Sequence, residues 1–115
     1  MNSVILTGNL ASDVELREFG EDKRLATFRL AVDRGGKDAD ADFFRIAVWD
    51  RQAQLCADYL TKGRKIGLEG RLRYQTWEEE GKKRSSVEVV AYRVEFLSGP
   101  AQPDGEVVPF EAAVA

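Results

Sequence analysis

Large aromatic residues alternate with arginines in two segments of this sequence. In the segment 42–49, alternate positions carry Phe43, Arg45 and Trp49. Further along, Trp77 follows a basic row of Lys65, Arg71 and Arg73. Aromatic rings stack on unpaired bases, and cationic side chains pair with phosphates. The pattern therefore predicts a surface for single-stranded nucleic acid, since a duplex hides the base faces that such rings need.

Burial is the other explanation for these rings. Trp and Phe on the second face of a sheet are often covered by a helix, a loop or another subunit. The arginines favour stacking, because Arg45 beside Phe43 would be a poor neighbour in a closed apolar interface. A protein-interaction module that uses the same aromatic face is the alternative. An RNA-binding module is another, since nothing in these residues selects for or against a 2′-hydroxyl group.

The residue inventory argues against an enzyme. The 115-residue chain has no His, which excludes Ser-His-Asp and Cys-His catalysis and every metal site that contains His. Its single cysteine, Cys56, forms neither an internal disulfide nor a thiolate zinc cage, and its apolar neighbours predict a core position. We therefore expect no catalytic residue, cofactor or metal. The absence of a cysteine framework, a signal-peptide core and a membrane span predicts a cytoplasmic protein without a membrane partner.

The charge balance points against an anionic partner until its distribution is considered. The chain has 17 basic and 20 acidic residues, a net charge of −3. All 17 basic residues lie in 1–97, together with 17 acidic ones, so this part is neutral. Residues 64–73 carry four basic groups and one acidic group, whereas residues 1–22 carry one basic and five acidic groups. The uneven distribution therefore leaves a basic strand for phosphates.

Hydrophobic periodicity predicts the elements that carry these residues. A two-residue period predicts strands at 24–34, 42–49, 64–77 and 87–97, and the apolar start of the chain adds a strand at 3–10. Inward positions are expected at Ile66, Leu68, Leu72 and Tyr74 in the fourth strand, and at Val90, Tyr92, Val94 and Phe96 in the fifth. The strand at 3–10 is apolar on both faces, which an oligomer contact would cover. A turn is expected at 78–84, with its basic run in a hairpin loop.

One helix is expected in the segment 50–63, with Asp50 capping its start and Gly63 ending it. Five strands with a helix between the third and fourth predict an all-β oligonucleotide- and oligosaccharide-binding (OB) fold, a Greek-key barrel. A five-stranded sheet with one covering helix is the competing architecture. After Leu97 the sequence loses Lys and Arg and gains Gly and Pro, so we expect a domain over 1–97 and a flexible, mildly acidic tail over 98–115.

Several motifs resemble the bacterial single-stranded DNA-binding protein family, in order over residues 1 to 97. They are NSVILTGNLASDVELR, ATFRLAVDR, DFFRIAVW, YLTKG, EGRL and Trp77. The resemblance implies an OB barrel, usually a homotetramer, that coats single-stranded DNA in replication, recombination and repair and catalyses no reaction. It implies stacking at Phe43, Trp49 and Trp77, a basic contact at Arg45, and further backbone contacts at Arg29, Lys62, Arg71 and Arg73.

Two features depart from that family's pattern. No Trp stands near Gly36, where many members carry a further stacking ring. Members typically end in an acidic tip that closes on Pro-Phe and recruits partner enzymes, whereas here Pro109 and Phe110 are followed by five more residues. This tip is neither strongly acidic nor terminal, so the recruitment of replication and repair proteins is less expected than DNA binding. These departures are those expected of a divergent or accessory member of the family.

Overall fold

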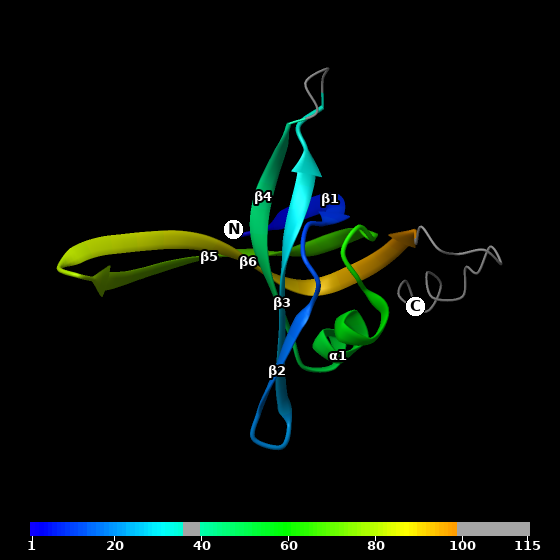
Figure 1. Cartoon of the computed structure of the whole chain (residues 1–115), viewed down its shortest axis with the longest axis horizontal. Helices are drawn as coiled ribbons and strands as arrows, with labels where there is room; N and C mark the ends of the chain where they lie inside the picture. Colours follow the sequence, from blue (N-terminus) through cyan, green and yellow to red (C-terminus); the bar gives the residue numbers. More distant parts are fainter. Residues whose placement is uncertain (36–39, 99–115) are drawn as a thin grey trace.

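The computed structural model describes residues 1–35 and 40–98 and contains a closed β-barrel with one helix (Figure 1). Its elements are β1 (Val4–Leu10), β2 (Glu15–Phe19), β3 (Lys23–Asp33), β4 (Ala41–Trp49), α1 (Asp50–Tyr59), β5 (Lys65–Glu79) and β6 (Lys82–Ser98). The strands form one sheet in the order β1-β5-β6-β4-β3-β2, and an additional pairing of β1 with β3 closes the ring. The predicted fold class is confirmed, and this closure excludes the open-sheet alternative.

Closure of the barrel depends on two glycines at which strands approach one another closely. A β-carbon at Gly8 would collide with the carbonyl oxygen of Ala31, and one at Gly70 would collide with the carbonyl oxygen of Val90. Gly70 also adjoins a register shift between β5 and β6. These positions therefore accept only glycine without movement of the backbone.

The strand β2 is absent from the sequence prediction. It forms an antiparallel hairpin with β3, with Gly20 in the turn at a φ of 64°. Leu16 is the one residue of β2 that is even partly buried, so the segment lacks the repeated apolar positions that identify a strand. The hairpin extends from the lower end of the barrel in Figure 1.

The second half of the β5–β6 hairpin leaves the barrel as a two-stranded ribbon, which corrects two predicted core positions. Leu72 is 44% exposed and Tyr74 is 67% exposed, because the barrel no longer covers either face of the ribbon there (Figure 1). The turn consists of Glu80 and Gly81 alone, both with positive φ, as a two-residue hairpin turn requires. The basic run 82–84 therefore lies in β6, paired with residues 77–79, and not in a loop.

A β-bulge in β6 corrects a third predicted core position. Glu69 pairs with Arg93 and Gly70 with Ala91, so Tyr92 is an extra residue without a partner on β5. Tyr92 is 53% exposed. The alternation changes phase at this residue, because the core-facing positions in β6 are Val89 and Ala91 before the bulge and Val94 after it. A strict period of two along 87–97 therefore missed Val89 and Ala91 and was wrong for Tyr92, whereas the predicted core position Val90 is buried.

The helix α1 covers one end of the barrel and is shorter than predicted. Ala53 and Cys56 in the helix, and Leu60 directly after it, join the core cluster, which confirms the predicted core position of Cys56. Asp50 begins the helix without acting as its cap, since the capping position is Trp49 and no side chain bonds there. Gly63 lies beyond the helix in a turn, where its N–H donates to the carbonyl oxygen of Leu10. In the described ranges, no helix is long and apolar enough to cross a membrane.

Candidate nucleic-acid interface

One outer face of the sheet carries most of the predicted site residues. Trp49 of β4 pairs with Leu25 of β3, and Arg73 of β5 pairs with Glu88 of β6, so the outward side chains of neighbouring strands form continuous rows. We call this surface the stacking face. Its rings and ionic side chains include Phe19, Phe43, Arg45, Trp49, Arg71, Arg73, Trp77 and Glu88.

A hollow on this face lies where β4, β5 and β6 meet. Its volume is about 380 Å³. It is lined by Leu25, Arg45, Ala47, Trp49, Arg73, Gln75, Trp77, Ser86 and Glu88. Trp49 is 37% exposed and Trp77 is 44% exposed, so both rings present accessible surface to an incoming planar group. The two Trp residues that the sequence singled out thus border a single depression with two arginines.

An ion pair lies in the hollow. The Nε atom of Arg45 donates to Oε2 of Glu88 at 3.0 Å. The Glu88 side chain is only 10% exposed, while that of Arg45 is 63% exposed. The carboxylate therefore holds one edge of the guanidinium against the sheet, and the rest of the Arg45 side chain is available to an anion. It also neutralises part of the positive charge in the hollow.

A second cluster lies further along β3 and β4. The guanidinium carbon of Arg29 lies 5.1 Å from the centroid of the Phe43 ring, a cation–π arrangement. Phe43 is 55% exposed, so a base has access to this ring beside a cation that can contact its phosphate. Arg29 pairs with Arg45 in the β3–β4 register, which connects this cluster to the hollow.

Two predicted contact residues have different placements. Arg71 is exposed in β5 two positions before Arg73, on the same row as the hollow. Lys62 lies apart, in the turn between α1 and β5, where its backbone N–H donates to Oδ1 of Asp13 at 2.9 Å. The position near Gly36, where a further stacking ring is absent, lies outside the described residues.

Sequence reasoning missed two members of the stacking face. Phe19 contacts Trp49, with 6.2 Å between the ring centroids and 35° between the ring planes. Glu88 is the buried partner of Arg45. The alternation of Glu15, Arg17 and Phe19 was a usable signal for the first, but too short to suggest a strand. Nothing in the local sequence of β6 marked Glu88, because the bulge beyond it had shifted the expected faces.

The one cysteine contributes no chemistry to this face. Cys56 is 1% exposed in the core below α1, and burial raises the pKa of its thiol to about 12. The thiol therefore stays protonated near neutral pH, where only a thiolate would be nucleophilic. The stacking face provides rings, cations and a carboxylate. Rings and cations suit reversible binding of a polymer that has flat bases and an anionic backbone.

Comparison with known proteins identifies relatives over most of the chain. Residues 1–97 match the Single-strand binding protein family. A single-stranded DNA-binding protein of Clostridium tetani is 42% identical over 112 residues, covering 91% of this chain and 77% of the relative. One of Thermosynechococcus vestitus is 34% identical over 111 residues, covering 95% and 92%. One of Treponema pallidum is 38% identical over 102 residues, covering 84% of this chain but 58% of the relative.

Proposed function

The chain belongs to the single-strand binding protein family, and from this premise we propose that it binds single-stranded DNA with little dependence on base sequence. The observation that carries the proposal is the hollow bordered by Trp49 and Trp77 together with Arg45 and Arg73. An aromatic ring accepts any base, because every base has a π face. Sequence tolerance is therefore a direct consequence of binding through rings.

Binding divides between rings and cations. Bases stack on Trp49, Trp77 and Phe43, each stack contributing about 1–3 kcal/mol. Arg45 in β4 and Arg71 and Arg73 in β5 contact the phosphates along the stacking face, and Arg29 does so beside Phe43. Lys62 lies apart from the hollow, so it contacts a phosphate only if the bound DNA strand continues past the end of the barrel. Each neutralised phosphate steepens the fall of log affinity with log salt by about 0.7.

The direct test is fluorescence anisotropy with a labelled thymidine oligomer. We expect saturable binding that a single-stranded competitor of mixed sequence displaces and a duplex of the same sequence does not. An RNA oligomer of that sequence tests the RNA-binding alternative, which requires tighter binding of RNA than of DNA. Failure of the wild-type chain to bind any single strand would contradict the proposal.

A wider role follows from this binding. We propose that the chain protects single strands during DNA replication, recombination and repair in the cytoplasm, as a binding protein and not as an enzyme. Residues 1–97 are the binding domain in this proposal, and 98–115 are the tail.

A homotetramer is part of the same proposal. Ile5 in β1 is 73% exposed, and a second hollow of about 260 Å³ lies between its strand and the neighbouring β5 and β6. Apolar walls of this hollow include Leu6, Leu68 and Leu97. Such a surface away from the stacking face suits contact with another copy of the chain. Light scattering tests it, since a mass of one chain at micromolar concentration would contradict assembly.

A further inference from the structure

We propose that Phe19 and Trp49 form an additional base-stacking platform on the β2–β3 hairpin, so that the bound strand continues past the hollow onto this arm. The inference rests on the proposed function and adds a binding residue to it. Phe19 does not line the hollow, whereas Trp49 does, so the pair carries the aromatic surface beyond it.

The ring geometry determines how a base is held. The centroids are 6.2 Å apart, while a base inserted between two rings needs about 7 Å, or two contacts of 3.5 Å. The space between the rings is therefore too narrow for a base. Phe19 is 45% exposed and Trp49 is 37% exposed, so the accessible surface is on the outside of the pair. A base stacks across this outer surface, in which the planes of the two rings are inclined to each other by 35°.

Cations flank the platform on the same face. In the register of the hairpin, Phe19 pairs with Lys23, and Arg17, two positions earlier in β2, pairs with Leu25. Both cationic residues are exposed, and neither has an ion-pair partner within 4.0 Å in the described part of the chain. On the opposite face, Glu18 is paired with Arg24 at 3.3 Å. Glu15, two positions before Arg17 on the same row, is also without an ion-pair partner in the described residues. The side of the hairpin that carries the ring thus has two unpaired cations against one unpaired carboxylate, an excess of positive charge for the phosphates of a bound strand.

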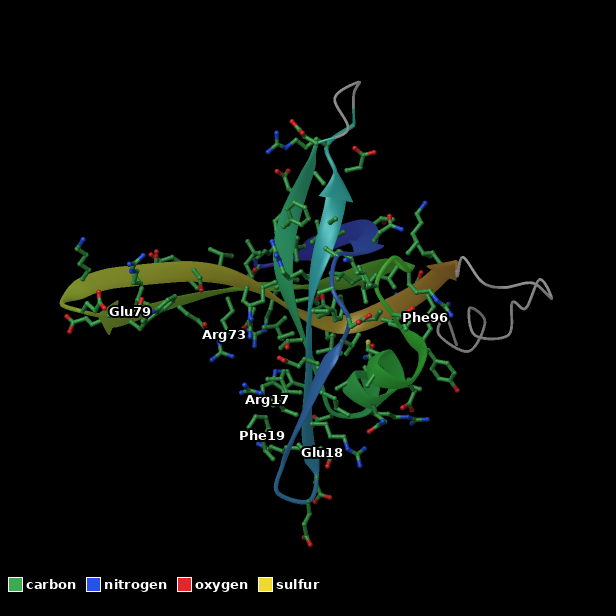
Figure 2. The ribbon with its side chains drawn as sticks, viewed as in Figure 1. Arg17, Glu18, Phe19, Arg73, Glu79 and Phe96 are labelled. Carbon is green, nitrogen blue, oxygen red and sulfur yellow. The ribbon has the colours of Figure 1, made fainter. Side chains whose placement is uncertain are left out.

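The arrangement of the arms makes a continuous path possible. Figure 2 shows the labelled Arg17 and Phe19 projecting from the β2–β3 hairpin into the angle between this arm and the β5–β6 ribbon. Arg73 projects from the ribbon into the same angle. Trp49 connects the two arms, because it lines the hollow beside Arg73 and contacts Phe19. A strand that leaves Trp77 and crosses Trp49 therefore reaches Phe19 without a change of face.

A second ring pair provides the matched control. Tyr59 at the end of α1 and Phe96 of β6 have centroids 6.1 Å apart, and Tyr59 is 51% exposed. This pair lies off the stacking face. Phe19→Leu and Tyr59→Leu therefore remove rings of similar exposure and similar partnership, one on the proposed platform and one away from it.

The experiment measures affinity for thymidine oligomers of stepwise increasing length. For oligomers that fill only the hollow, we expect Phe19→Leu to bind like the wild type. For longer oligomers, Phe19→Leu should lose about fivefold in affinity, the lower end of the loss for one stacking ring. Phe19→Trp should restore the affinity, and Tyr59→Leu should match the wild type at every length. Thermal melting of each variant controls for folding.

Two results would overturn the platform while leaving the proposed function in place. One is equal affinity of Phe19→Leu and wild type at all lengths. The other is an equal loss at all lengths, which would mean that Phe19 acts only by supporting Trp49. If the wild-type chain bound no oligomer at all, the proposed function would fail, and the platform with it.

Discussion

Two ring pairs in this molecule have almost the same geometry and different surroundings. Phe19 and Trp49 lie 6.2 Å apart beside a hollow lined by two arginines, whereas Tyr59 and Phe96 lie 6.1 Å apart where the end of α1 meets β6. Separation and exposure do not distinguish them. The difference is that cationic side chains lie beside the Phe19–Trp49 pair on a continuous sheet face, which suits a single strand with bases and phosphates. Aromatic contacts alone therefore identify no binding site.

The contrast extends to the two sides of the barrel. On the stacking face, the aromatic side chains are more than one third exposed and contribute little to the core. On the side covered by α1, Ala53, Cys56 and Leu60 are buried and close the barrel end. Substitutions on the first side should change affinity with little change in stability. Substitutions in the core of the barrel should lower stability with little direct change in affinity.

The largest effect is expected from removing both Trp rings of the hollow. Trp49→Leu with Trp77→Leu should reduce the affinity for a thymidine oligomer by about 30-fold or more, since two stacks of about 1–3 kcal/mol each are lost. The melting temperature should change by only a few degrees, because Trp49 is 37% exposed and Trp77 is 44% exposed. Anisotropy and thermal melting measure the two quantities. A large fall in melting temperature with unchanged affinity would place these rings in the core instead.

The next largest effect is on barrel stability. Gly70→Ala should reduce the free energy of unfolding by about 1–3 kcal/mol, because the new β-carbon collides with the backbone at Val90. Gly67→Ala is the matched control on the same strand, since a β-carbon there meets the nearest atom at 3.5 Å, an ordinary contact. Urea unfolding measures both. Equal stability of the two variants would refute the role of Gly70 in closure.

Cys56 should make stability depend on pH in the alkaline range. Burial raises the pKa of this thiol from 9.0 to about 12, so the folded state retains a proton that the unfolded state releases above pH 9. Its contribution is fully present below pH 9 and falls by about 1.4 kcal/mol for each pH unit above it. Urea unfolding of wild type and Cys56→Ala between pH 7 and 10 should show a shallower decline in the variant. Parallel declines would contradict this prediction.

The smallest effect concerns the ion pair in the hollow. Glu88→Gln keeps an acceptor for Arg45 and removes one negative charge, so the affinity for single strands should rise about fivefold at 0.1 M salt. The slope of log affinity against log salt should steepen by about 0.7. Glu18→Gln is the control, because Glu18 pairs with Arg24 at 3.3 Å on the opposite face of the β2–β3 hairpin, outside the hollow. Weaker binding by Glu88→Gln would mean that orienting Arg45 matters more than its net charge.

Much of the barrel was predictable because its strands bury one face. The periods of two in 24–34 and 42–49 correctly predicted strands, in which Phe28, Leu30, Ile46 and Val48 are buried. They also placed Phe43 and Trp49 outside. Where a segment buries almost nothing, as in β2, the period carries no signal. The hairpin that bears Phe19 therefore emerges only from pairing with β3.

The remaining errors arise because local periodicity cannot detect which strands pair, in what register they pair, or where the barrel ends. Leu72 and Tyr74 continue the inward row of β5 beyond the last covering strand, so they are exposed. The prediction for Tyr92 is wrong because one extra residue in β6 inverts the alternation of inward and outward side chains. The extra residue lies opposite the close approach of β5 at Gly70, on the partner strand. Glu88 and Arg45 are 43 residues apart, and only the parallel pairing of β4 with β6 brings them together.

The most direct test of the account uses each Trp as its own reporter. The chain has two Trp residues, so Trp77→Phe leaves only Trp49 to emit, and Trp49→Phe leaves only Trp77. Titration of each variant with a thymidine oligomer should quench its emission in parallel with binding measured by anisotropy, and a duplex should leave the emission unchanged. Binding of the labelled oligomer without a change in either emission would contradict base stacking in the hollow.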